Sequence, residues 1–292
     1  MTLSGHDRAV ALYQTVFPAR RGDTIEDVRT RFEAISGHLE MVPGTDVSEI
    51  DAGGVPALEV TAPGGRTDRA LLWFHGGGYS IGSAAGYRAF ASALASACRT
   101  RVIVPDYRLA PECPFPAALE DATAAARWLV ERFGVAATAL GGDSAGGALA
   151  VAALAALRDA GAALPFRAVA VSPLVDLSAR GASFDVNAAT DVALSRAAVA
   201  NVRAIYLQGA DPLDPRASPV VADLHGLPPT LVLVSSSEVL LDDARLLVER
   251  FTECGGEVTL VVEDGMVHVW PMFSSFLPEG ARAIERIAAF LG

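Results

Sequence analysis

Lysine is absent from this chain of 292 residues, so each of its 23 basic side chains is an arginine. The 34 aspartates and glutamates outnumber these arginines and leave a net charge of −11. Proteins that bind nucleic acid or anionic membranes carry basic patches or stripes. The acidic balance therefore predicts no nucleic-acid partner, and solubility is the simplest explanation for it.

Cysteine is scarce, and the three that occur, Cys98, Cys113 and Cys254, are widely spaced and odd in number. This pattern suits neither a disulfide framework nor a zinc site and is typical of a reducing compartment. Long apolar runs are also missing, because the longest, Ala145–Leu157, is shorter than the roughly 20 residues needed to cross a bilayer. Charged residues at 6–8 without an apolar run behind them argue against a signal peptide. We therefore predict a soluble, cytoplasmic protein without membrane insertion.

Short apolar runs alternate with helical patterns over most of the chain, 51% of which is hydrophobic. The runs that read as buried strands are Ala70–Phe74, Arg101–Val104, Ala137–Leu140, Arg167–Val171, Thr230–Val234 and Val258–Val262. The helical patterns between them are Ala117–Phe133, Ala145–Ala160 and Asp242–Cys254. Such alternation predicts an α/β fold with a mostly parallel central sheet, covered by helices on both faces.

Two further segments are predicted to be helical and to form a cap. In the first fifty residues, Asp23 and Glu26 form a capping-box-like start, and apolar residues follow at helical spacing. An insertion at residues 178–212 carries a second helical pattern, and insertions of this length are usually functional. The apolar positions of that pattern are Leu194, Ala198, Val202 and Ile205. We expect these segments to form a lid over the strand ends. The chain is therefore predicted to divide into N-terminal cap helices at 1–50, a catalytic domain in two parts at 51–177 and 213–292, and an inserted cap segment at 178–212.

The strongest motif is Gly142-Asp143-Ser144-Ala145-Gly146-Gly147, between the predicted strand ending at Leu140 and the helical pattern behind it. A sharp turn from strand to helix strains the serine and leaves no room for side chains two positions away, so glycine is needed at both places. The turn exposes the serine hydroxyl in front of the free N–H groups of the helix. This arrangement resembles the nucleophile elbow of the α/β-hydrolase fold and makes Ser144 the candidate nucleophile.

A second motif, His75-Gly76-Gly77-Gly78-Tyr79, follows the predicted strand Ala70–Phe74. Consecutive glycines let backbone N–H groups approach a reacting carbonyl oxygen and stabilise the charge that forms on it. We therefore assign an oxyanion hole to the N–H groups of Gly77, Gly78 and Ala145. A phosphate-binding loop is disfavoured because no Gly-Lys-Ser/Thr follows. His75 precedes the serine, which is the wrong order for the base of such a hydrolase, and is predicted to hold the loop.

The general base is expected after the nucleophile, because α/β-hydrolases carry serine, acid and histidine in that order. Two of the five histidines meet this condition. His225 lies in a surface-like approach to the strand Thr230–Val234 and leaves no later positions for an acid and a base. His268 follows the last predicted strand, where the base belongs, and is the candidate.

Two acidic residues are candidates for the group that orients the base and stabilises its imidazolium form. Glu238 lies just after the strand Thr230–Val234, in a loop that could set its longer side chain back. Asp176 ends an earlier strand and is its rival. Asp242 and Asp243 fit the start of the following helix better. Glu238 is favoured, and Asp176 stays open.

Together these motifs resemble the hormone-sensitive-lipase-like family of bacterial esterases, from about residue 69 to the end of the chain. Further matching segments are Pro105–Glu112, Pro114–Ala118, Asp211-Pro212, Asp214-Pro215, Ser218-Pro219 and Leu227–Pro229. In that family the acid opens an Asp-Pro-Leu-x-Asp-like segment about thirty residues before the histidine, a register that Glu238 fits. The chain departs from the family in having Glu for the usual Asp. It also has Val269 and Trp270 after His268, where Gly-Phe is common, and these larger groups should narrow the pocket.

The resemblance implies a serine carboxylesterase that acts on small-molecule esters of short to medium acyl chains through an acyl-enzyme intermediate. It also implies a cap, no metal or cofactor, and a homodimer, since dimers are common in the family. A lactonase or amidase that uses the same residues stays open. A non-catalytic small-molecule receptor on this fold is disfavoured because such receptors lose the base, and His268 is present. Pocket candidates, for each of which core packing is an equally good explanation, are Tyr79, Tyr206, Leu207 and Trp270.

Overall fold

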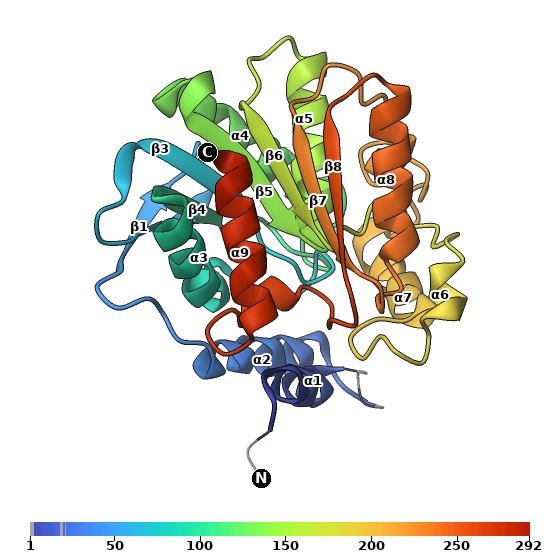
Figure 1. Ribbon diagram of the computed structural model, residues 1–292. Helices are drawn as coiled ribbons and strands as arrows, with labels where there is room; N and C mark the ends of the chain where they lie inside the picture. Colours follow the sequence, from blue (N-terminus) through green and yellow to red (C-terminus); the bar gives the residue numbers. More distant parts are fainter. Residues whose placement is uncertain (1–2, 18–19, 21) are drawn as a thin grey trace.

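The computed structural model describes residues 3–17, 20 and 22–292, and one eight-stranded sheet forms the centre of this part of the chain (Figure 1). The strands are β1 (Asp46–Asp51), β2 (Pro56–Thr61), β3 (Arg66–Phe74), β4 (Thr100–Pro105), β5 (Thr138–Asp143), β6 (Arg167–Val171), β7 (Thr230–Ser235) and β8 (Val258–Glu263). Their order across the sheet is β1-β2-β4-β3-β5-β6-β7-β8. β2 is antiparallel to β1 and β4, and the remaining pairs are parallel. The predicted mostly parallel sheet is confirmed.

Side chains of β3 alternate between the two faces of the sheet, as the geometry of a strand requires. Leu71 and Trp73 pack in the core on one face, and Leu72 and Phe74 pack in the core on the other. β5 and β7 are buried along their whole length, so both of their faces are apolar. This is why both strands read in the sequence as continuous apolar runs.

Helices cover both faces of the sheet (Figure 1). On one face lie α3 (Ala84–Cys98) and α9 (Pro278–Leu291), and on the other lie α4 (Ala117–Phe133), α5 (Ala145–Asp159) and α8 (Leu241–Glu253). α5 packs on the sheet and beside α4, and its alanine-rich surface is buried on nearly all sides. It begins directly after β5, and its N-terminus therefore lies at the carboxyl edge of the sheet, where open α/β sheets bind ligands.

Four further helices of the described chain lie at this edge: α1 (Gly5–Val16), α2 (Ile25–Ile35), α6 (Ser183–Val186) and α7 (Arg196–Leu207). The predicted capping box of α2 is wrong by one residue. Thr24 Oγ1 accepts a hydrogen bond from Asp27 N–H at 3.2 Å, and Asp27 accepts one from Thr24 N–H at 2.9 Å. Asp23 takes no part in the box because its carboxylate binds Arg31.

The observed elements also differ from the predicted division at the end of the first segment. Its helical part ends with a 3-10 turn at Ser36–His38, and β1 begins at Asp46, inside the range assigned to cap helices. β1 is polar and almost wholly exposed, so it lacks the apolar run by which a strand is recognised. The helix expected in residues 178–212 is present as α7. None of the helices in the described ranges has both the length and the apolar character to cross a bilayer.

Candidate active site

Ser144 occupies a strained turn between the end of β5 and the start of α5. Its backbone angles are φ 54° and ψ −121°, in a region that residues with a side chain rarely adopt. The flanking glycines are needed for space, because a Cβ on Gly146 would lie 2.0 Å from the carbonyl oxygen of Phe74. A Cβ on Gly142 would lie 2.2 Å from the carbonyl oxygen of Gly146. The chain therefore makes the tight turn that its glycine spacing predicts.

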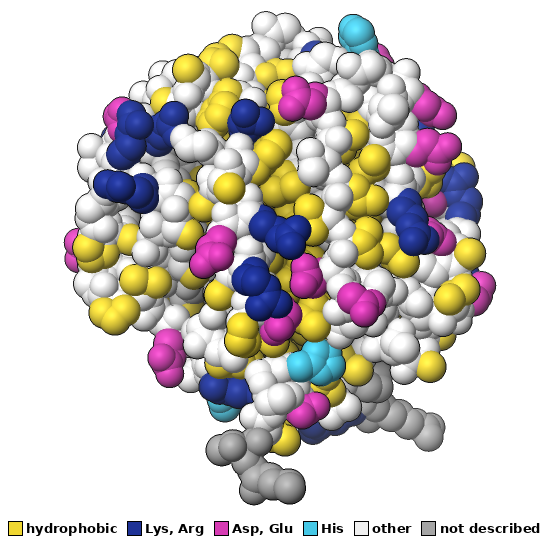
Figure 2. All heavy atoms as spheres, in the orientation of Figure 1, with side chains coloured by type: hydrophobic (Ala, Val, Ile, Leu, Met, Phe, Trp, Pro, Cys, Tyr) yellow, Lys and Arg dark blue, Asp and Glu magenta, His cyan; other side chains and the backbone are white. Residues whose placement is uncertain are grey.

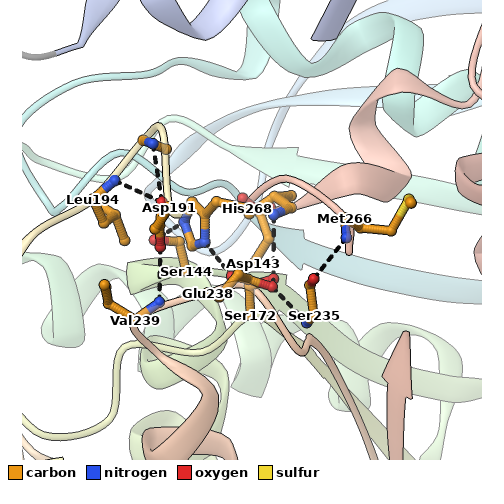
Figure 3. Close-up of polar contacts among 12 residues, drawn as sticks. Asp143, Ser144, Ser172, Asp191, Leu194, Ser235, Glu238, Val239, Met266 and His268 are labelled. Carbon is orange, nitrogen blue, oxygen red and sulfur yellow. Dashed lines mark hydrogen bonds and ion pairs between the residues drawn. The ribbon is translucent and has the colours of Figure 1, made fainter. Parts of the chain in front are cut away.

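The structure brings Ser144, His268 and Glu238 together in one line of contacts (Figure 3). Ser144 Oγ lies 3.0 Å from His268 Nε2, and His268 Nδ1 lies 2.6 Å from Glu238 Oε2. The three side chains follow β5, β7 and β8, whose carboxyl ends lie at the same edge of the sheet. These are the contacts by which a histidine can take a proton from a serine while a carboxylate orients it.

Glu238 uses both of its carboxylate oxygens. Oε2 faces His268, whereas Oε1 accepts hydrogen bonds from Ser235 N–H at 2.7 Å and from the Ser172 hydroxyl at 2.8 Å. The Ser172 oxygen also accepts a hydrogen bond from Val269 N–H, next to the histidine. Burial raises the pKa of Glu238, and the hydrogen bond to His268 acts against this rise. The carboxylate is thus held in a fixed orientation toward the imidazole.

The pKa of His268 is raised above its usual value. Burial alone lowers the pKa, but the hydrogen bond to Glu238 and the negative charges of Glu238, Asp191 and Asp143 raise it by more. Tyr13 of α1 donates a hydrogen bond from its hydroxyl to the His268 carbonyl oxygen at 2.7 Å, so the cap fixes the backbone of this residue too.

The rival residues lie away from this line of contacts. Asp176 accepts hydrogen bonds from Ser178 N–H at 2.9 Å and from Arg180 Nε at 3.0 Å, and it is not bonded to the histidine. His225 is exposed, with its Nδ1 3.2 Å from the carbonyl oxygen of Cys254. Neither residue lines the cavity that opens over Ser144, as far as the structure describes it.

The loop His75–Tyr79 after β3 lies beside the serine, and Gly77 and Gly78 line the same cavity as Ser144. Gly77 has φ 117°, and a Cβ there would lie 2.1 Å from the carbonyl oxygen of Ile81, so only glycine fits. Ala145 is the first residue of α5, where backbone N–H groups have no partner within the helix. These are the three positions assigned to the oxyanion hole.

His75 packs inside the protein as a support of this loop. Its ring stacks on Tyr107 with the centroids 4.3 Å apart, and the Tyr107 hydroxyl donates a hydrogen bond to the His75 carbonyl oxygen at 2.7 Å. Burial lowers the pKa of His75 to about 4, so the ring is neutral at physiological pH. Its place agrees with the supporting role that the sequence predicted.

Asp143 and Tyr87 connect the serine turn with this glycine loop, a link that sequence reasoning missed. Asp143 accepts hydrogen bonds from Trp73 Nε1 at 2.8 Å and from the Tyr87 hydroxyl at 2.7 Å. The same hydroxyl accepts a hydrogen bond from Gly76 N–H at 3.0 Å. Burial raises the pKa of Asp143 to about 6, although both hydrogen bonds act to lower it. No sequence signal joins these residues, because the contacts come from three separate elements.

A cavity of about 530 Å³ opens above Ser144 and His268. The larger apolar residues that line it from the N-terminal segment are Phe17, Ile25, Val28 and Phe32, and those from the inserted segment are Val192, Leu194, Val199, Val202 and Ile205. α7 packs directly on the glycine loop, because a Cβ on Gly78 would lie 2.7 Å from a methyl group of Val202. Both predicted cap segments therefore contribute walls to the space over the serine.

The four predicted pocket residues lie elsewhere and need correction. The rings of Tyr79 and Tyr206 stack on each other, 3.8 Å apart and nearly parallel, inside the core. Leu207 and Trp270 are also buried in the two hydrophobic cores. Among the described residues that line the cavity, none of these four is present. Core packing, the alternative explanation for each, accounts for them.

Chemistry that needs a metal would require a cluster of ligating side chains. The described ranges contain no group of three or more histidine, cysteine, aspartate or glutamate residues arranged to hold a metal ion. Polar side chains that line the cavity include those of Ser144, His268, Asp143 and Asp191.

Comparisons with known proteins show to which family the chain is similar. Residues 71–272 match a family model described as the alpha/beta hydrolase fold. An acetyl-hydrolase of Streptomyces hygroscopicus is 45% identical over 262 residues, which cover 89% of this chain and 86% of that protein. An esterase of Acinetobacter venetianus is 34% identical over 252 residues, covering 85% of this chain and 82% of the relative.

Solved structures give the same assignment. The crystal structure of an esterase from the bacterial hormone-sensitive lipase family superposes with a TM-score of 0.96 at 45% identity, covering 100% of this chain and 98% of that one. Fold, site and relatives lead to one conclusion: this chain belongs to the hormone-sensitive-lipase-like family of α/β-hydrolases and is a carboxylic ester hydrolase.

Proposed function

We propose that this esterase cleaves short- to medium-chain carboxylic esters by transferring the acyl group to Ser144, with His268 as general base and Glu238 as the acid that orients it. The observation that carries the proposal is the unbroken series of contacts from Ser144 Oγ through His268 to Glu238. Ser144 and His268 of this series line a mostly apolar cavity that is large enough for a small ester.

In the first half of the reaction, His268 takes the hydroxyl proton of Ser144 while Oγ attacks the ester carbonyl carbon. The carbonyl oxygen becomes an oxyanion, which the N–H groups of Gly77, Gly78 and Ala145 stabilise. Such donors act on charge that develops in the transition state, and losing one usually costs about 10²–10³ in rate. His268 then gives its proton to the leaving alkoxide, and the alcohol departs from the acyl-serine.

In the second half, a water molecule attacks the acyl carbonyl carbon while His268 takes one of its protons. The carboxylic acid leaves as Ser144 Oγ recovers a proton from the imidazolium. Glu238 stays ionised throughout and stabilises the positive charge on His268. Free enzyme is restored without any other reactant.

The limit on acyl chain length follows from the cavity. Its walls come from side chains of both cap segments, and its volume of about 530 Å³ lies in the lower half of the range for small-molecule pockets, roughly 300–1,000 Å³. The name of the Streptomyces relative, an acetyl-hydrolase, supports a small acyl group. Acetyl to roughly hexanoyl esters are therefore the proposed substrates, and larger acyl groups need the cap to move.

The test is hydrolysis of p-nitrophenyl esters from acetate to dodecanoate by the wild type and by Ser144→Ala. We expect highest kcat/KM for the short chains and a loss of at least about 10³-fold in the variant. Ser275→Ala, at an exposed serine, serves as the matched control and should retain full activity. Activity that persists in Ser144→Ala, or a preference for dodecanoate, contradicts the proposal. A matched p-nitroanilide and a lactone test the amidase and lactonase alternatives.

A further inference from the structure

Asp191 joins the inserted cap segment to the loop that carries Glu238. One carboxylate oxygen of Asp191 accepts hydrogen bonds from the N–H groups of Ala193 and Leu194, both at 2.9 Å. The other oxygen accepts a hydrogen bond from Val239 N–H, also at 2.9 Å. Val239 directly follows Glu238, so a residue of the insert holds the backbone next to the proposed acid (Figure 3).

Two neighbours of Asp191 hold the same loop. Asn187 Nδ2 donates hydrogen bonds to the carbonyl oxygens of Ser236 at 2.9 Å and Glu238 at 2.7 Å. Thr190 Oγ1 donates one to the Ser237 carbonyl oxygen at 3.0 Å. Each of the four residues from 236 to 239 therefore has a backbone group bonded to the insert. A loop held at this many points has little freedom to move the carboxylate that it carries.

Asp191 also faces the reaction site. It lines the same cavity as Ser144 and His268, and Figure 3 places its carboxylate beside the imidazole ring. We propose that Asp191 is a positioning residue of the reaction, which fixes the loop of Glu238 and places a second negative charge next to His268. The inference rests on the proposed roles of Ser144, His268 and Glu238.

The charged and titratable groups that face His268 come from four places. Glu238 approaches from the loop after β7, Asp191 from the insert, Asp143 from the end of β5, and Tyr13 from α1. Asp143 is already engaged by Trp73 and Tyr87, and the Tyr13 hydroxyl binds the histidine backbone. After Glu238, Asp191 is the next largest charge that raises the pKa of His268. Its removal should therefore lower that pKa.

The test is the dependence of kcat and kcat/KM on pH for Asp191→Asn with p-nitrophenyl butyrate. Asparagine keeps the shape and one acceptor oxygen but loses the charge and the acceptor for Val239 N–H. The base acts when neutral, so a lower pKa of His268 moves the ascending limb of kcat/KM toward acid, by roughly half a unit to one unit. We also expect kcat to fall about tenfold, because the carboxylate of Glu238 is less well fixed.

A matched control is Asp185→Asn, which removes a carboxylate from the same segment. Asp185 pairs with Arg196 at 2.9 Å on the surface and contacts neither the acid loop nor the cavity. Asp185→Asn should leave kcat and the ascending limb of kcat/KM against pH unchanged. If the limb moves as far in Asp185→Asn as in Asp191→Asn, the local role of Asp191 is overturned. Thr190→Val keeps the charge of Asp191 but loses the hydrogen bond to the Ser237 carbonyl oxygen. It should therefore lower kcat without moving the ascending limb of kcat/KM.

The remaining outcomes also decide the matter. An unmoved limb in folded Asp191→Asn, even with a lower melting temperature, overturns the proposal and leaves a structural role only. If that variant does not fold, Asp191→Glu replaces it, and unchanged kcat in Asp191→Glu overturns the positioning role. Ser144→Ala is assayed in parallel. If Ser144→Ala keeps activity, the proposed mechanism has failed. If Ser144→Ala is inactive and Asp191→Asn behaves like the wild type, only the inference about Asp191 has failed.

Discussion

Glu238 contacts His268 through a side chain that is one methylene longer than that of an aspartate. The extra methylene leaves room for Oε1 to bind Ser235 and Ser172 while Oε2 faces the imidazole. Both oxygens of the longer side chain are therefore engaged, one by the two serines and the other by the histidine.

This geometry predicts different outcomes for the two acidic candidates. Glu238→Gln removes the charge that stabilises the imidazolium and should lower kcat by about 10²–10⁴. Because that charge also raises the pKa of His268, the ascending limb of kcat/KM, expected above pH 6.5 in the wild type, should move toward acid. Asp176→Asn should keep kcat within about threefold, since the carboxylate of Asp176 binds Ser178 and Arg180 of its own loop and not His268. Measured pH profiles of both variants decide, and the reverse pattern would make Asp176 the acid.

The central residues of the site could be predicted because chain order restricts them. Ser144 has a glycine pattern of its own, and His268 was the one histidine placed after the last strand. Asp191 and Tyr87 had no such signal, since their partners lie on other elements and their spacing along the chain carries no period. Tyr79 and Trp270 adjoin motif residues in sequence, but their side chains point into the core. Adjacency in the chain does not determine which way a side chain points.

At the scale of elements, the turn from β5 to α5 depends on close backbone contact with β3. A Cβ on Gly146 would meet the Phe74 carbonyl oxygen at 2.0 Å, and neither group is free to move, because α5 is buried against the sheet. The strained backbone of Ser144 is thus maintained by the packing of two strands and a helix.

Gly146→Ala is therefore expected to push α5 away from β3. The free energy of unfolding should fall by about 3 kcal/mol or more, and kcat/KM by at least about 10²-fold through displacement of Ser144. Chemical denaturation together with esterase assays measures both. Gly37→Ala is the control, because a Cβ there meets nothing within 4 Å, and it should change neither quantity. Wild-type stability in Gly146→Ala would show that the turn is looser than described.

Most of the buried strands and the helices α4, α5 and α8 could be predicted because each has a clear apolar pattern. Four elements, β1, β2, α3 and α9, were not predicted, and α9 was missed although its apolar residues recur at helical spacing. β1 and α3 lack a clear pattern for different reasons. β1 is polar and exposed at the edge of the sheet, so nothing distinguishes it from a loop. α3 is rich in alanine and is buried on several sides, so apolar residues do not form a single stripe.

At the scale of the whole molecule, acidic residues outnumber arginines. The described residues that line the cavity likewise include acidic side chains and no arginine. Charged side chains of both signs are interspersed on the face in Figure 2, so no single patch dominates it. Among the described residues that line the cavity, the charged ones are Asp143 and Asp191, and no arginine occurs. An anionic substrate would therefore enter against the local field and lose its hydration without a partner.

We expect strong selection against esters that carry a carboxylate. p-Nitrophenyl hemisuccinate resembles p-nitrophenyl butyrate in length but ends in a negative charge, and its kcat/KM should be at least about 10²-fold lower. The methyl ester of the hemisuccinate restores neutrality and should recover most of the rate. Comparable rates for the charged and neutral substrates would mean that the acyl end of the substrate lies outside the described cavity.

The hydrogen bond from Tyr13 to the His268 carbonyl joins two residues that are 255 positions apart. During synthesis α1 leaves the ribosome well before its partner His268 is made. Ser144 likewise contacts His268, which is synthesised 124 positions later. Contacts between such distant parts of a chain form late in folding, after the intervening segments have closed. Esterase activity recovered during refolding therefore indicates a fully folded chain. A chain truncated before His268 should show no activity.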